Sequence, residues 1–175
     1  MPFLLFIIGV ITAAGVWYWR MKQAGEVVGE LADAAQDVKN AARRFGFNRK
    51  KNVHPADSLD DARIAAVGVV LAVAASDGEL TAGELDATRQ EAAKTFEIDE
   101  TEAGEMVALA RWTVGQCGNT DNAIYRLARR TRALAGLEAQ PDLERMARAV
   151  AAVDTGAVDE RAEDALAHIA RHFRT

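Results

Sequence analysis

The sequence predicts an all-α protein: a single N-terminal transmembrane helix continues into an amphipathic neck helix, and a compact bundle of about six helices follows. Three observations predict this class. Residues 3–19 carry no charge, residues 24–45 repeat apolar side chains at heptad spacing, and helix-start motifs recur from Ser58 onward. Half of the 175 residues are apolar, only 6% are aromatic, and alanine dominates. This composition favours closely packed helices over sheets.

Residues 1–20 are expected to form a membrane anchor. A helix over the uncharged run 3–19 spans about 25 Å, and local thinning closes the gap to a hydrocarbon core of about 30 Å. Trp17 and Trp19 are followed at once by Arg20, as is typical of a bilayer boundary. A cleaved signal peptide would carry positive charge before its apolar run, whereas here the charge follows it. The same bias predicts a single-pass protein of a bacterial-type inner (cytoplasmic) membrane, with the N-terminus outside and the C-terminal domain in the cytoplasm.

The anchor also offers a surface to a neighbouring helix. Gly9 and Ala13 stand four residues apart, and such small residues let a second membrane helix approach closely. The pair is short, so two interpretations stay open: contact with a specific partner, or an ordinary feature of a membrane helix.

The neck helix is predicted over residues 21–46 and ends at Gly46. Its seam residues repeat at spacings of four and three, and the residues beside the seam are mostly small and uncharged. This wide stripe, with Leu31 and Val38 near its middle, could pack on another protein, on the chain's own domain or on a sister helix, so a homo-oligomer is one expectation. The seam consists of Ala24, Val28, Leu31, Ala35, Val38, Ala42 and Phe45.

A basic linker is predicted over residues 47–57. Residues 1–55 carry a net charge of +4, and residues 56–175 carry −9. Five cations around the start of the linker either bind anionic lipid headgroups or form a solvated connection. A nucleic-acid partner is not expected beside so acidic a domain. These cations are Arg43, Arg44, Arg49, Lys50 and Lys51.

Residues 58–175 are predicted to form the helical domain. Capping motifs and turn residues place six helices there. The expected helix starts are Ser58 with Asp61, Thr81 with Glu84, Asp99 with Glu102, Asp121, Pro141 and Asp159, and the expected ends are Ala75, Phe96, Cys117, Gly136, Val153 and Phe173. Since Cys117 is the single cysteine, the chain has no internal disulfide.

The domain repeats part of itself. Residues 72–80 read AVAASDGEL and residues 149–158 read AVAAVDTGAV, so Asp77 and Asp154 occupy equivalent turns. Each copy is an alanine-rich helix, an acidic turn and a second helix, which predicts two pseudo-symmetric helical hairpins. The segment SDGELTAGE resembles the TerB-like tellurite-resistance family, over about residues 58–173. The resemblance implies an all-helical domain with neighbouring acidic turns, a divalent-cation site between them, and a link to envelope or metal stress.

Membrane-anchored DnaJ-like co-chaperones are similar in placing an anchor before such a domain. This chain has no J domain, and residues 54–56 read His-Pro-Ala instead of the His-Pro-Asp signature. Stimulation of an Hsp70 is therefore not implied. The second acidic turn also departs from the family pattern, because Thr155 is inserted and Arg161 stands where the first turn has Glu84.

Acidic side chains in and after the two turns are candidate ligands of a hard cation, Ca²⁺ or Mg²⁺, because both prefer oxygen ligands. Helix capping is the alternative, since Glu84 stands three residues after Thr81 and Asp159 precedes a helix. Both interpretations stay open. The candidates are Asp77, Glu79, Glu84, Asp154, Asp159 and Glu163.

Two further clusters of side chains are candidate binding sites. Arg126, Arg129 and Arg130 form a patch that either receives an anionic partner or complements a helix C-terminus and the domain's own acids. Asp164, His168 and His172 are spaced by four on the last helix, where they either bind zinc or remain solvated polar residues.

These features predict a non-enzymatic, membrane-anchored interaction module that faces the cytoplasm. The sequence contains no phosphate-binding glycine loop and nominates no base for a nucleophile, so an enzyme is not expected. The expected partners are membrane lipid and a protein, either an integral membrane complex or a cytoplasmic protein. The alternative function is an accessory or assembly subunit of a larger integral membrane complex, bound through the small-residue face of the anchor and the neck seam.

Overall fold

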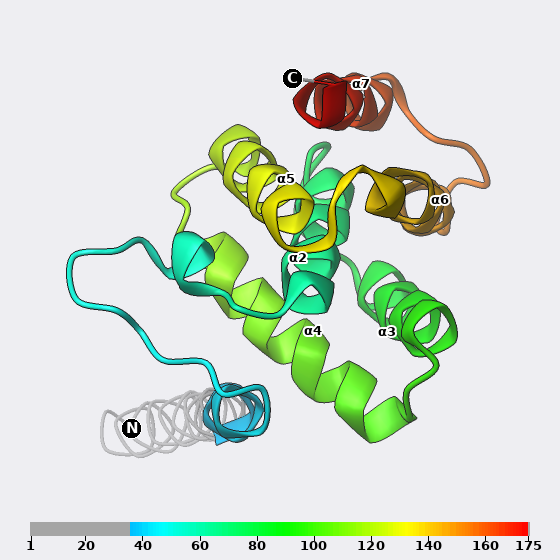
Figure 1. Ribbon diagram of the computed structural model, residues 1–175. Coiled ribbons are helices and arrows are strands. Elements are labelled where there is room, and N and C mark those ends of the chain that lie inside the picture. The colour runs from blue at the N-terminus through cyan, green and yellow to red at the C-terminus, as the bar shows by residue number, and fades with distance from the viewer. Residues whose placement is uncertain (1–35, 175) are drawn as a thin grey trace, which may run out of the picture. The chain divides into compact units, whose positions relative to one another are not determined.

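The computed structural model describes residues 36–174, and Figure 1 shows them as a bundle of helices. The predicted all-helical bundle is confirmed, and the part described contains no strand. No helix within these residues is both long and apolar enough to cross a membrane. The predicted anchor and most of the predicted neck lie outside the described residues, and so do Gly9, Ala13, Trp17, Trp19, Arg20 and Leu31.

Short turns connect the regular elements. A helical segment over residues 36–44 comes first. It is followed by the 3-10 helix η1 (Pro55–Ser58), α2 (Ala62–Ala74), α3 (Ala82–Phe96), α4 (Glu100–Gly115), α5 (Thr120–Ala135), the 3-10 helix η2 (Leu137–Ala139), α6 (Gln140–Ala151) and α7 (Glu160–Arg174). Residues 37–175 form one compact unit.

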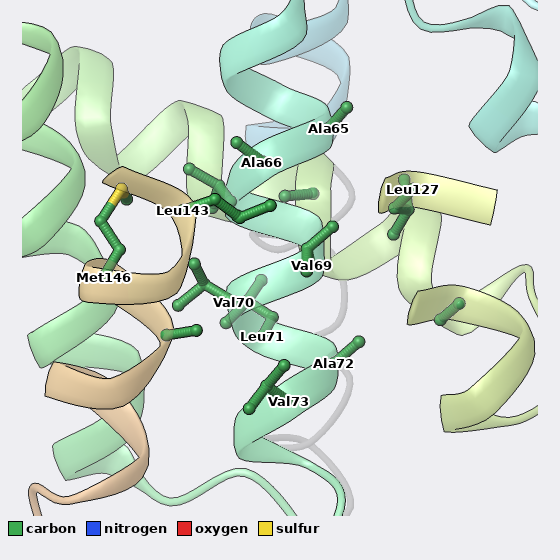
Figure 2. Close-up of a cluster of buried hydrophobic side chains, with 14 of the residues drawn as sticks. Ala65, Ala66, Val69, Val70, Leu71, Ala72, Val73, Leu127, Leu143 and Met146 are labelled. Atoms are coloured by element: carbon green, nitrogen blue, oxygen red, sulfur yellow. The ribbon is translucent and has the colours of Figure 1, made fainter. Parts of the chain in front are cut away.

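Helix α2 lies at the centre of the bundle (Figure 1). All residues in 64–74 are buried, and helices α3 to α7 all contact α2. The sequence explains this position, because α2 carries no charge after Arg63 and a helix that is apolar on all sides is stable only when it is surrounded. Figure 2 shows Leu127 of α5 on one side of α2, and Leu143 and Met146 of α6 on the other.

A glycine sets the distance between α2 and α5. A Cβ atom added to Gly68 would lie 2.9 Å from Cδ1 of Leu127 and 3.5 Å from its Cδ2. Leu127 is fully buried, so its side chain has no open space to move into. The missing side chain of Gly68 therefore allows the two helices to pack closely.

The two copies of the sequence repeat correspond to α2 with α3 and to α6 with α7, and the helices of each pair contact one another. The copies differ in burial. Helix α2 is also covered by α4 and α5, whereas α6 buries a single face. The buried residues of α6 are Leu143, Met146, Ala147 and Val150.

Four of the predicted helix starts are confirmed, one of them being Pro141 in the first turn of α6. The Thr81 hydroxyl accepts the N–H of Glu84, and the Glu84 carboxylate accepts the N–H of Thr81 at 2.8 Å, so both halves of a capping box are present. Asp99 and Asp159 cap α4 and α7, each accepting a backbone N–H three residues further on. Helix α3 ends at Phe96, as predicted.

Two other predicted starts are wrong by a few residues. The N-cap of α2 is Asp61, because Ser58 belongs to η1 and its hydroxyl donates to the carbonyl oxygen of His54. The N-cap of α5 is Asn119, whereas Asp121 lies in the first turn. The helix dipole favours an acid in the first turn as well as at the cap, so Asp121 alone does not mark the boundary.

The end of the neck packs on the domain. Ala41 is fully buried, and Val38, Phe45 and Phe47 pack against the core. Gly46, with φ of +63°, ends the helix with the paired hydrogen bonds of a Schellman motif. Two described seam residues, the predicted partner contact Val38 and Phe45, therefore pack on the chain's own domain, together with Ala41 beside the seam.

Candidate functional site

The second acidic turn lies against the helix that follows the first. A Cβ atom added to Gly83 would lie 2.8 Å from Oδ1 of Asp154, so the carboxylate of Asp154 sits beside the first turn of α3. The N-terminus of a helix attracts negative charge, which stabilises this placement. The fold thus brings together turn residues that are about seventy positions apart in the sequence.

Three of the six candidate ligands have partners inside the protein. Glu84 is 7% exposed and completes the capping box of α3. Asp159 caps α7. Glu163 accepts hydrogen bonds from both terminal nitrogens of Arg148, one of them at 3.0 Å. These contacts account for the three carboxylates without any cation.

Asp77 and Glu79 are exposed and form no hydrogen bond or ion pair within the part of the chain that the structure describes. In residues 36–174, no three His, Cys, Asp or Glu side chains form a group that could hold a metal ion. Asp77 and Glu79 therefore remain the acidic side chains of the first turn that are open to a partner.

The arginine patch on α5 binds acids of the same chain. Arg126 lies 2.7 Å from Asp57, and Arg129 lies 3.2 Å from the other oxygen of that carboxylate. Arg130 pairs with Asp60 at 3.1 Å. These contacts hold η1 and the segment after it on α5, so much of the predicted anion-binding capacity is used inside the domain.

A cavity of about 290 Å³ opens between α5 and α7. Its lining includes Asp164, His168 and His172, so the predicted stripe faces one space. The ring of Tyr125 meets that of His172 edge to face, with centroids 4.9 Å apart. Ser76 also lines the cavity, and its buried hydroxyl has no hydrogen-bond partner in the described structure. Ser76 and Tyr125 could not be predicted as lining residues, because spacing along one helix does not reveal residues from other elements.

Most of the side chains that line this cavity are polar or ionisable. Burial lowers the pKa of His172, and the charges of His168 and Arg171 lower it further. The His172 imidazole is therefore mostly uncharged at pH 7 and can accept or donate a hydrogen bond. Asp164 and His172 are two helical turns apart, about 12 Å along the axis, so the stripe cannot direct all of its side chains at one ion.

The five cations predicted around the linker fall into two groups. Arg44 pairs with Glu105 at 3.0 Å, and Lys50 lies 3.4 Å from Asp60. The remaining three are exposed and form no ion pair in the described part of the chain. These three are Arg43, Arg49 and Lys51.

No family model matches this chain, and neither a curated protein nor a solved structure matches it. Function must therefore be inferred from the geometry of the chain itself. Four features of the described structure are candidate sites: the acidic turns, the arginines paired on α5, the cavity beside α7 and the exposed cations after the neck.

Proposed function

We propose that this protein is a membrane-anchored, non-enzymatic interaction module of the TerB-like kind, with its helical domain in the cytoplasm. The observation that carries the proposal is how the neck enters the domain: Ala41 is fully buried, and Phe45 and Phe47 pack against the core. The end of the neck is therefore part of the domain's core and not a flexible tether. The apolar run 3–19 supplies a membrane anchor for that segment.

In this proposal, α2–α3 and α6–α7 are two pseudo-symmetric hairpins, and envelope or metal stress is the physiological context. Asp77 and Glu79 are the exposed acids of the first acidic turn, and in this proposal they are the surface offered to a partner protein or to a cation such as Ca²⁺ or Mg²⁺. Calorimetry with both ions tests the cation. Heat of binding that is lost in Asp77→Ala supports cation binding at the first turn. If the unchanged protein gives no heat, cation binding is refuted.

The membrane part of the proposal is tested on the full chain in its native membrane. We expect the chain to stay in the membrane fraction after alkaline extraction. We also expect protease to digest the C-terminal domain only when it reaches the cytoplasmic side. A chain recovered in the soluble fraction with its start removed would refute the anchor.

The second candidate is an accessory or assembly subunit of a larger integral membrane complex, and the small pair Gly9 and Ala13 favours it. Purification in mild detergent followed by mass spectrometry of the co-purifying proteins distinguishes the interaction module from the accessory subunit. Loss of a stoichiometric complex in Gly9→Leu, but not in Asp77→Ala, favours the subunit, and the reverse favours the module. Asp86→Ala is the matched control for Asp77→Ala, because Asp86 is an exposed acid of the same hairpin.

A further inference from the structure

We propose that an exposed basic surface at the entrance to the domain binds the headgroups of anionic phospholipids, an inference that rests on the membrane anchor proposed above. The basic surface consists of Lys39, Arg43, Arg49 and Lys51. All four side chains are exposed, and none forms an ion pair in the described part of the chain. Four uncompensated cations in such a short stretch make a local positive patch on an otherwise acidic unit.

The absence of pairing at the basic surface contrasts with the bundle. Arg63 and Arg126 each have a nitrogen 2.7 Å from a carboxylate oxygen, and Arg145 has one at 2.8 Å. Carboxylates are plentiful in this domain, which carries −9 over residues 56–175. Several acids of the domain thus pair with arginines of the bundle, whereas no acid of the described residues pairs with the basic surface.

The helical segment 36–44 separates its two faces clearly. Val38 and Ala41 turn toward the core, and Phe45 just after the segment packs there as well. Lys39 and Arg43 stand four residues apart on the exposed side, so they are neighbours on one face. The segment therefore has one side occupied by the domain and the other side free for a charged partner.

The loop that carries the other two cations is tethered at both ends. Near its start, the ring of Phe47 meets that of Trp112 at a centroid distance of 5.8 Å. Near its end, Nε2 of His54 lies 3.1 Å from the carbonyl oxygen of Gln116. Arg49 and Lys51, the two loop cations of the basic surface, lie between these two contacts. Tethering reduces the conformational freedom that binding would otherwise remove.

Anionic lipid is the partner that fits this surface. The cytoplasmic leaflet is negatively charged, and each Lys or Arg near it strengthens association about fivefold. The same leaflet repels the acidic bundle, which turns the basic surface toward the bilayer.

The test uses the full chain in nanodiscs of phosphatidylcholine alone or of phosphatidylcholine mixed with phosphatidylglycerol. Hydrogen exchange is measured for loop 46–54. We expect exchange to be at least about fivefold slower in the anionic nanodiscs. This protection should be lost at high salt and in the double variant Arg49→Gln with Lys51→Gln. The matched control, Lys94→Gln with Arg111→Gln, removes two exposed cations from the bundle and should keep it.

Equal exchange in both lipids, or protection that survives in the double variant, would overturn the lipid-binding surface while leaving the proposed anchor intact. A chain that fails to enter either nanodisc overturns both proposals. Thermal unfolding of the variants guards against a trivial loss, since both loop cations are exposed and their removal should leave the unfolding temperature unchanged.

Discussion

Gly68→Ala is expected to destabilise the domain, although alanine is the better helix former. In a helix interior the exchange normally stabilises by about 1 kcal/mol. Here the new Cβ would lie 2.9 Å from Cδ1 of Leu127, and Leu127 is fully buried, so the neighbour must shift inside a packed core. Overpacking of this kind costs about 1–3 kcal/mol. The difference is a net loss of about 1 kcal/mol in the free energy of unfolding.

The same contact predicts that Gly68 and Leu127 are coupled. Leu127→Ala alone removes a fully buried side chain and is expected to cost about 2–5 kcal/mol. In that background the clash is gone, so Gly68→Ala should stabilise by about 1 kcal/mol through helix propensity. The effect of Gly68→Ala thus changes sign, which corresponds to a coupling free energy of about 2 kcal/mol.

Urea unfolding of the compact unit 37–175, followed by circular dichroism, measures all four corners of this cycle. Gly104→Ala is the control, because Gly104 lies in α4 and its nearest neighbour atom, on the flexible side chain of Arg89, would be 4.0 Å from the new Cβ. That variant should stabilise by about 1 kcal/mol. If Gly68→Ala stabilises as much as the control, or has the same sign in both backgrounds, close packing of α2 on α5 is refuted.

Three further predictions concern single side chains. Thr81→Ala should lower the free energy of unfolding by about 1 kcal/mol by removing half of the capping box, and an unchanged urea midpoint would contradict this. Burial, with His168 and Arg171, lowers the pKa of His172 below its unfolded value of 6.5, so the unfolded chain binds the proton more readily. Stability should therefore fall as pH drops through 6.5, and His172→Gln should reduce that dependence, as unfolding curves at several pH values would show. Burial also raises the pKa of the Cys117 thiol, so a thiol reagent should react slowly with the folded domain and quickly in urea, and fast reaction without urea would exclude this burial.

Local sequence determined where most helices begin and end. The Thr81 capping box and the caps at Asp99 and Asp159 close within three or four residues, so neighbouring residue types suffice to predict them. The central position of α2 is a more global property. It too can be traced to sequence, because a helix without charge after Arg63 must be covered on all sides. The N-cap of α5 is harder to predict from the sequence, since Asp121 suits the first turn of the helix as well as its cap.

Only the tertiary structure decided which side chains meet. Asp57 binds Arg126 and Arg129 across about seventy residues, and Asp154 comes to rest beside α3. A charge in the sequence states that a partner is needed, but an ion pair forms with whichever opposite charge the packed backbone brings within reach.

The neck shows the same division between sequence and tertiary structure. Its heptad spacing fixed which face is apolar, but not which surface would cover that face. Ala41 and Phe45 pack on the domain because the fold presents an apolar surface to them. The hydrophobic effect has no direction of its own, so a periodic pattern specifies the need for burial, and the three-dimensional arrangement of the helices supplies the place.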